Sequence, residues 1–301
     1  MNAIPYRPRR TMLYVPAHVE RHIEKARALH CDSIIFDMQE SVPSSLKERA
    51  RSTLKEAFNN KDFGRSETVV RINPLNSPWG HGDLELAASL PINAILLPRV
   101  ESKQQIIDTV KALDDVGGEK IQLMANIESP FGVLRAEEIA GASDRVCCLV
   151  MGTTDLANEM KLSLTPERTG LLTSLSLTIL AARAHRKGVV DGPHFDLKDV
   201  KNCEFACRQA RDLGFDGKAV IHPVQLAYTN DAFTPKRGDV DRALRIIEAL
   251  KEAESKGMST AIIDDHLIEQ AMIEWAKRVI AVYEAVNDLG QTELLGQVKR
   301  R

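Results

Sequence analysis

Glu128 and Asp155 are the two residues whose type and spacing most directly suggest chemistry. Each follows a short apolar run, and the two positions are 27 residues apart, about the length of one strand-and-helix repeat. If the two runs are neighbouring parallel strands, both carboxylates lie at the same end of the sheet. Magnesium is usually held by such oxygen ligands together with water and substrate, whereas zinc favours His and Cys. The spacing therefore predicts a magnesium site, with a general acid and base pair, as in glycosidases, as the alternative.

Arg71 suggests that the ligand of this site is anionic. It follows the apolar segment Thr68-Val69-Val70, which predicts that its guanidinium lies deep in a pocket. A buried, unpaired cation is costly unless it meets an anion. We therefore expect an anionic substrate or intermediate beside Arg71. Polar residues end the other apolar runs as well, at Asp37 and Glu40, Asn73, Arg99, Asp191 and His222.

The elements that position these residues form a regular repeat. Between residues 11 and 235, short apolar runs alternate with longer amphipathic segments, as buried parallel strands do when helices connect them. Eight strands are predicted, over residues 11–17, 32–39, 68–73, 94–100, 122–128, 146–152, 189–193 and 218–222. The predicted helices include 19–30, 46–58 and 167–187. Eight such repeats close naturally into an α/β fold, the (β/α)8 TIM barrel, with the active site at the carboxyl ends of the strands.

The alternative to a barrel is a doubly wound open sheet. That fold normally has a glycine-rich phosphate turn after its first strand. This chain has Val15-Pro16-Ala17-His18 there, without a glycine. We therefore expect a barrel domain over residues 1–235. Residues 236–301 are predicted to form a C-terminal helical extension, with helices at about 239–256 and 267–287 and a break at Gly257.

Composition narrows the class of protein. The 301 residues carry 40 Lys and Arg against 42 Asp and Glu, with no long run of one sign, so we expect no nucleic acid partner. Five cysteines without a CxxC pair favour a reducing, cytoplasmic setting. The chain contains no run of about 18 apolar residues. We therefore expect neither a membrane partner nor a signal segment.

Several short motifs follow one another along the chain. They are RTMLYVPA at 10–17, DMQESV at 37–42, VRIN at 70–73, LPRV at 97–100, IESPFGV at 127–133, GTTDL at 152–156, and GFDGK at 214–218 followed by IHP at 221–223. In this order they resemble the citrate lyase β-subunit-like (HpcH/HpaI aldolase/citrate lyase) family. The likeness covers about residues 9 to 280.

The resemblance implies a Mg²⁺-dependent carbon–carbon lyase. Members of the family have (β/α)8 barrels, assemble as homotrimers or hexamers, and cleave or form 3-hydroxy-3-carboxy acyl thioesters such as malyl-CoA, methylmalyl-CoA and citramalyl-CoA. By motif, Glu128 and Asp155 resemble the metal ligands, and Arg71 resembles the residue that steadies the thioester enolate. Asp37 and Glu40 resemble an acidic pair behind the metal and its waters.

The resemblance also implies contributions from elsewhere in the chain. Asp264, in the segment IIDDH at 262–266, resembles an aspartate that reaches into a neighbouring subunit's site and transfers a proton. The extension would then pack as a lid on another protomer. Arg10, Arg21 and Lys25 match a basic region that contacts coenzyme A in relatives.

Three residues depart from the family pattern. Gln39 stands where Glu is usual, Arg99 where Lys is usual, and Ala17 where Gly is usual. Because of these departures, the motifs do not determine which substrate the protein acts on. The alternatives are a citrate lyase β-subunit acting on citryl bound to an acyl carrier protein, a malyl-CoA thioesterase on the same scaffold, and a non-catalytic partner subunit. The intact metal and enolate residues argue against the last of these.

Overall fold

Eight parallel strands form the centre of the first of two units, Arg9–Phe233, into which the chain divides. The computed structural model describes residues 7–59 and 62–287. The strands are β1 (Thr11–Pro16), β2 (Ser33–Asp37), β3 (Glu67–Arg71), β4 (Ala94–Leu97), β5 (Gln122–Ile127), β6 (Val146–Met151), β7 (Gly188–Asp191) and β8 (Gly217–Val220). Each strand pairs in parallel with the next, and β1 also pairs with β8, where Met12 lies opposite Ala219.

This closure confirms the (β/α)8 barrel and excludes the open sheet. Every observed strand begins within one residue of its predicted start. The predicted strands extend one to three residues too far at their carboxyl ends. In five of the strands the extra residues include a polar one: Gln39, Asn73, Arg99, Glu128 and His222.

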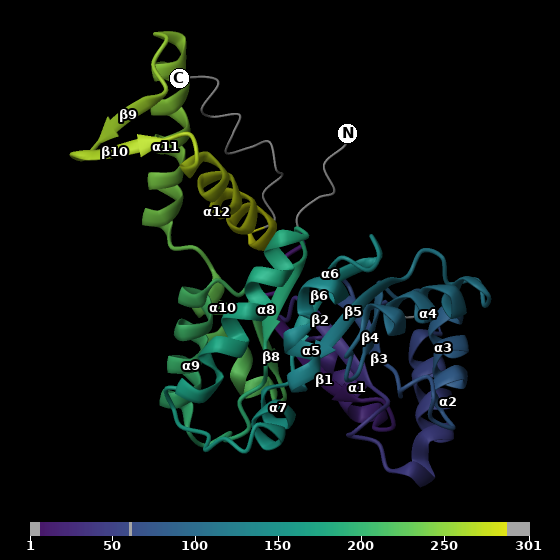
Figure 1. Cartoon of the computed structure of the whole chain (residues 1–301). Helices are drawn as coiled ribbons and strands as arrows, with labels where there is room; N and C mark the ends of the chain where they lie inside the picture. The colour runs from purple at the N-terminus through teal and green to yellow at the C-terminus, as the bar shows by residue number, and fades with distance from the viewer. Residues whose placement is uncertain (1–6, 60–61, 288–301) are drawn as a thin grey trace. The chain divides into compact units, whose positions relative to one another are not determined.

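Helices lie around the strands (Figure 1). The longer ones are α2 (Lys47–Phe58), α3 (Gly80–Ser89), α4 (Lys103–Asp114), α8 (Leu172–Ala184), α9 (Val200–Leu213) and α10 (Leu226–Phe233). The shorter ones are α1 (Glu20–Ala26), α5 (Pro130–Leu134), α6 (Ala136–Ala140) and α7 (Thr153–Glu159), with single 3-10 turns η1 (Ser44–Leu46), η2 (Thr169–Leu171) and η3 (Pro223–Gln225). None of the described helices is long and apolar enough to cross a membrane.

The strands are buried on both faces, which is why most of their residues are apolar. One face packs under the helices, in a cluster that includes Leu13, Ile34 and Val70. Because successive side chains alternate, the other residues of each strand point into the barrel. The barrel interior is filled by Met12, Ile35, Val69, Ala94, Leu96, Met124, Cys148, Val150, Val190 and Ala219.

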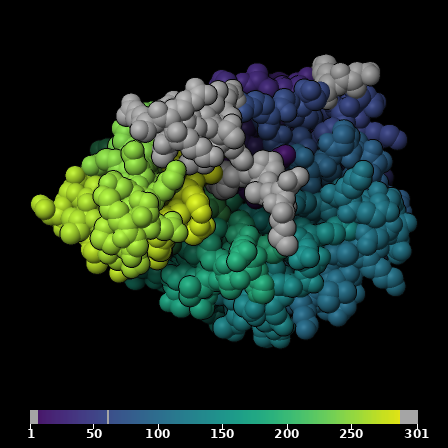
Figure 2. Space-filling view, turned by 90° about the horizontal axis from the view of Figure 1, so that it is seen from above, coloured from purple at the N-terminus to yellow at the C-terminus, as the bar shows by residue number. Residues whose placement is uncertain are grey.

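The second unit contains the long helix α11 (Arg237–Ser255), the strands β9 (Thr260–Ile263) and β10 (His266–Glu269), and α12 (Met272–Val286). It has an apolar core of its own, built from Val240, Ala243, Ile246, Leu250, Ile268, Ala276 and Ile280. In Figure 2 its atoms, light green to yellow, form one continuous body. The unit therefore has its own packed interior.

The hairpin of β9 and β10 corrects the prediction of a helix from residue 267. Leu267 lies in β10, opposite Ile262, and the last helix begins at Met272. Asp264 and Asp265 form the turn, with φ of 49° and 60°. Aspartate tolerates this left-handed conformation, which two-residue hairpin turns require. The β-branched residues before the turn favour a strand over a helix.

Candidate active site

The inward rows of four strands become polar at their carboxyl ends. Beyond the apolar interior, β1, β2, β3 and β5 and the residue after β5 present Tyr14, Asp37, Arg71, Asn126 and Glu128. Together with Glu40 and with Asp155 of α7, these side chains line a cavity of about 320 Å³. The predicted metal ligands, the predicted enolate residue and the predicted acidic pair thus all meet in one cavity. It lies where barrels of this kind hold their active sites.

Arg71 is held by two carboxylates and an aromatic ring. Its Nε and Nη2 donate to Oδ1 and Oδ2 of Asp37 at 2.7 and 2.8 Å, and its Nη1 lies 3.3 Å from Oε2 of Glu40. The guanidinium carbon is 4.8 Å from the centre of the Tyr14 ring. Burial works to raise the pKa of Asp37, but the hydrogen bonds and charge of Arg71 outweigh it and lower that pKa. Asp37 is therefore ionised and serves as the partner that orients Arg71.

Glu128 is buried at the end of β5 and held by two donors. Its Oε1 accepts a hydrogen bond from the backbone N–H of Arg99 at 2.7 Å, and its Oε2 accepts one from Nδ2 of Asn126. Gly152 leaves room for it, since a Cβ there would stand 2.3 Å from the Glu128 Cβ. Burial raises the pKa of Glu128 to about 7, and the charge of Asp155 adds to the rise. A cation beside this carboxyl group would favour its ionised form.

The charges of the cavity fit a divalent cation. Among the described residues that line it, Asp37, Glu40, Glu128 and Asp155 face a single cation, Arg71. Within the described residues, no group of three or more His, Cys, Asp or Glu is placed to cage a metal. Magnesium often binds through one or two carboxylates and completes its shell with water and substrate. Glu128 and Asp155 therefore suit Mg²⁺ with open positions.

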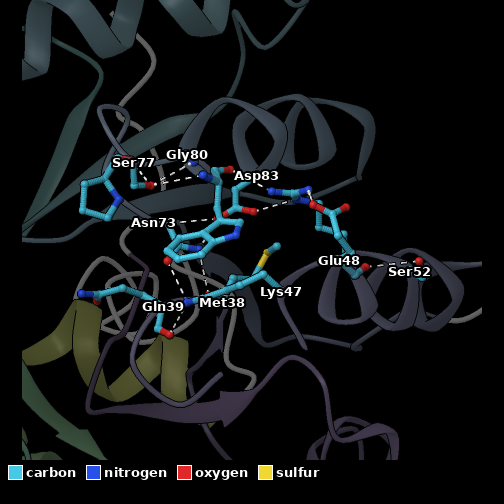
Figure 3. A network of polar contacts seen from close by, with 12 residues as sticks. Met38, Gln39, Lys47, Glu48, Ser52, Asn73, Ser77, Gly80 and Asp83 are labelled. Carbon is cyan, nitrogen blue, oxygen red and sulfur yellow. Dashed lines mark hydrogen bonds and ion pairs between the residues drawn. The ribbon is translucent and has the colours of Figure 1, made fainter. Parts of the chain in front are cut away.

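A buried network holds the loop between β2 and α2, which follows Asp37 and carries Glu40 (Figure 3). Lys47 Nζ donates to the carbonyl groups of Met38 and Gln39 at 2.8 and 2.6 Å and to Oδ1 of Asn73 at 2.8 Å. Asp83 accepts from the backbone N–H and Nδ2 of Asn73 at 2.9 and 2.6 Å. The network ties the loop after β2 to the loop after β3, and so holds the loop that places Glu40 beside the cavity.

A second buried network holds the cavity wall after β7. Asp191 is fully buried and accepts from Lys218 Nζ at 2.6 Å and from Arg168 Nη1 at 2.7 Å. Lys218 also donates to the carbonyl group of Gly192 at 2.5 Å. Pro193, the next residue, lines the cavity. Asp191 and Lys218 therefore anchor this wall.

The predicted coenzyme A contacts lie outside the cavity lining. Arg10 precedes β1, at the opposite end of the strand from the cavity, and its Nε and Nη2 each donate to Asp32 at 2.8 Å. The structure therefore does not bring Arg10 to the cavity. Arg21 and Lys25 are exposed on α1, one turn apart, and their contact with coenzyme A stays a prediction.

Asp264 lies in the hairpin turn of the second unit. Its carboxylate accepts from Arg245 Nη1 at 2.8 Å, and its side chain is largely exposed. It belongs to a different unit from the cavity. Its role in proton transfer stays a prediction.

Sequence reasoning missed three groups of the site: the Tyr14 ring, the Asn126 amide and the backbone N–H of Arg99. Strand alternation could have found Asn126, which lies two residues before Glu128 and so shares its face. No sequence signal marks the amide of Arg99, whose φ of 45° belongs to the left-handed region. The Arg99 side chain pairs instead with Glu159.

A closed parallel barrel with an acidic cavity at the carboxyl ends of its strands defines a TIM-barrel protein with an enzyme-like site. The chain belongs to the HpcH/HpaI aldolase/citrate lyase family, whose sequence profile matches residues 10–223. This confirms the resemblance inferred from the motifs.

Two relatives and one solved structure illustrate the likeness. The chain is 38% identical to the (3S)-malyl-CoA thioesterase of Cereibacter sphaeroides over 94% of this chain and 97% of the relative. It is 31% identical to citrate lyase subunit beta of Leuconostoc mesenteroides subsp. cremoris, over 93% and 94%. The structure of CitE from Mycobacterium tuberculosis in complex with magnesium, acetoacetate and coenzyme A has a TM-score of 0.74 and 26% identity, covering 92% of this chain and 98% of that chain.

Proposed function

We propose that this protein is a Mg²⁺-dependent enzyme that acts on a malyl-type acyl-CoA thioester. The observation that carries the proposal is the placement of Glu128 and Asp155 in one cavity with Arg71, which Asp37 orients. Two further facts support it. The M. tuberculosis CitE structure holds magnesium and coenzyme A, and relatives at 38 and 39% identity are malyl-CoA thioesterases.

We assign Mg²⁺ to Glu128 and Asp155, where it would act as a Lewis acid toward substrate oxygen atoms. Arg71 would bind the carbonyl oxygen of the thioester through Nη1, which lies 3.3 Å from Glu40 but, unlike Nε and Nη2, is not held by Asp37. Negative charge that develops on this oxygen is stabilised by a cation already in place. Arg71 is only 7% exposed, so water screens its charge weakly.

The same groups serve two reactions. In hydrolysis, a water oxygen adds to the thioester carbonyl carbon and the C–S bond breaks, which gives malate and free coenzyme A. In carbon–carbon cleavage, the hydroxyl group loses its proton to water, its oxygen forms a carbonyl group, and the bond between the hydroxyl-bearing carbon and the carbon beside the thioester breaks to leave the enolate. Glyoxylate leaves, and protonation of the enolate gives acetyl-CoA. Arg71 would stabilise the tetrahedral oxyanion of the first reaction or the enolate of the second.

We place hydrolysis first, because the thioesterase relatives are more similar to this chain than the citrate lyase subunits are. Their identities are 38 to 39%, against 30 to 32%. Carbon–carbon cleavage, which the motifs favoured, is the second candidate. It is supported by the citrate lyase subunits among the relatives, and by an Arg71 whose orientation suits an enolate equally well.

We further propose that the second unit serves a neighbouring protomer in a homotrimer or hexamer, with Asp264 as the proton donor there. Arg21 and Lys25 would then lie along the path of the coenzyme A phosphates.

The five cysteines all lie within the described residues and are free. Free thiols suit a reducing cytoplasmic compartment.

Product analysis tests the proposal and separates the two reactions. The purified protein is incubated with malyl-CoA, methylmalyl-CoA, citramalyl-CoA and citryl-acyl carrier protein, with Mg²⁺ or with a chelator. Free thiol reports hydrolysis, whereas glyoxylate with acetyl-CoA reports cleavage of malyl-CoA. We expect Mg²⁺-dependent release of free thiol from malyl-CoA. If no thioester of the panel yields either product when Mg²⁺ is present, the proposed function is wrong.

A further inference from the structure

Asn126 occupies the floor of the cavity. It lies on β5 between Met124, which fills the barrel interior, and Glu128, and all three share the inward face of the strand. Its side chain lines the cavity, yet the residue is only 2% exposed. An amide in this position is surrounded mainly by the apolar interior below and by Glu128 above.

The nitrogen and the oxygen of the Asn126 amide differ in their hydrogen bonding. Nδ2 donates a hydrogen bond to Oε2 of Glu128, whose Oε1 is held by the backbone N–H of Arg99. Oδ1 is buried and has no hydrogen-bond partner among the residues that the structure describes. This orientation is the favourable one, because turning the amide would place its oxygen against a carboxylate oxygen.

A buried carbonyl oxygen without a donor is costly, and a leucine of similar shape would avoid that cost. No described residue donates a hydrogen bond to Oδ1, and the Asn126 side chain lines the cavity. The missing donor must therefore come from the cavity. Ligands that offer an O–H group there are water and the hydroxyl of a hydroxyacyl thioester.

We propose that Asn126 is both a positioning residue and a specificity-determining residue. Its Nδ2 holds Glu128 in the orientation that receives Mg²⁺, and its Oδ1 accepts a hydrogen bond from an O–H group in the cavity, either the substrate hydroxyl or a bound water. This assignment rests on the proposed function of the cavity. Asn126 would recognise the hydroxyl group that is common to these substrates by a hydrogen bond.

Two variants test the proposal. Asn126→Leu preserves the approximate shape and removes both the donor and the acceptor, and Asn126→Ala serves if the leucine variant does not fold. Met124→Leu is the matched control, because it changes the same inward row without touching a polar atom. Isothermal titration with MgCl₂ reports the positioning role without requiring turnover. We expect the Mg²⁺ affinity of Asn126→Leu to fall by about tenfold or more, and that of Met124→Leu to stay unchanged.

Succinyl-CoA, which lacks the hydroxyl group, separates the two sources of the O–H donor. The measured quantity is the ratio of its inhibition constant to the KM for malyl-CoA. If the substrate hydroxyl is the donor, the ratio falls about tenfold in Asn126→Leu. If a bound water is the donor, the ratio is unchanged in Asn126→Leu and kcat falls.

Wild-type Mg²⁺ affinity together with an unchanged ratio and kcat in Asn126→Leu would show that Asn126 only fills space. A wild-type protein that neither binds Mg²⁺ nor turns over any thioester would instead refute the proposed function itself.

Discussion

Gly152→Ala should disable the cavity by adding one methyl group beside Glu128. The new Cβ would stand 2.3 Å from the Glu128 Cβ and 2.5 Å from its Oε2. Carbon atoms in contact prefer about 3.5 to 4.0 Å, so Glu128 must move by roughly 1 Å. Functional side chains tolerate displacements of only about 0.5 Å. The substitution therefore separates Glu128 from the position that the Arg99 N–H and the Asn126 amide define.

The expected loss is large in Mg²⁺ binding and moderate in stability. We expect Mg²⁺ affinity to fall about 100-fold, which corresponds to about 2.7 kcal/mol. Overpacking of the buried site should lower the free energy of unfolding by about 1 to 3 kcal/mol. Isothermal titration with MgCl₂ measures the first quantity, and urea denaturation followed by circular dichroism measures the second.

Gly238→Ala is the matched control. Gly238 lies in the first turn of α11, has open space where a Cβ would be, and has no positive φ. Alanine there should stabilise the helix slightly and leave Mg²⁺ binding unchanged. A folded Gly152→Ala protein that binds Mg²⁺ with wild-type affinity would contradict the assignment of Glu128 as a ligand.

Four further outcomes are expected. Asp155→Ala should abolish Mg²⁺-dependent turnover while circular dichroism remains native; an active, chelator-resistant variant would remove Asp155 from the metal site. Arg71→Lys keeps the charge but loses the planar fork that Asp37 holds, so kcat should fall by a larger factor than KM rises. A change in KM alone would contradict the role of Arg71 in stabilising the oxyanion. Burial raises the pKa of Glu128 to about 7, and Mg²⁺ binds the ionised carboxylate. The Mg²⁺ affinity measured by titration should therefore rise about tenfold per pH unit up to about pH 7 and level off above it. An affinity that stays constant from about pH 5.5 to 8 would contradict this. Mixed Asp264→Asn and Asp155→Ala proteins should regain part of the activity after subunit exchange, and no recovery despite proven exchange would place the proton donor elsewhere.

The sequence by itself determined the barrel and the residues at the ends of its strands. A strand buried on both faces is a continuous apolar run, and the first polar residue after it marks the end that faces the cavity. Both features are local, so Arg71 and Glu128 could be placed without knowledge of the fold. The spacing of Glu128 and Asp155 predicted the magnesium site, and the motifs in their order along the chain predicted the family.

Only the tertiary structure decided how these groups are paired. Arg71 meets Asp37 across 34 positions of sequence, and Glu128 meets the backbone N–H of Arg99 across 29. Such pairs depend on the register between neighbouring strands of the closed sheet. The hairpin that carries Asp264 escaped prediction for a related reason. Its strands have four residues each, too few for a period to appear, and they are stabilised by pairing with each other and by packing on the core of their own unit.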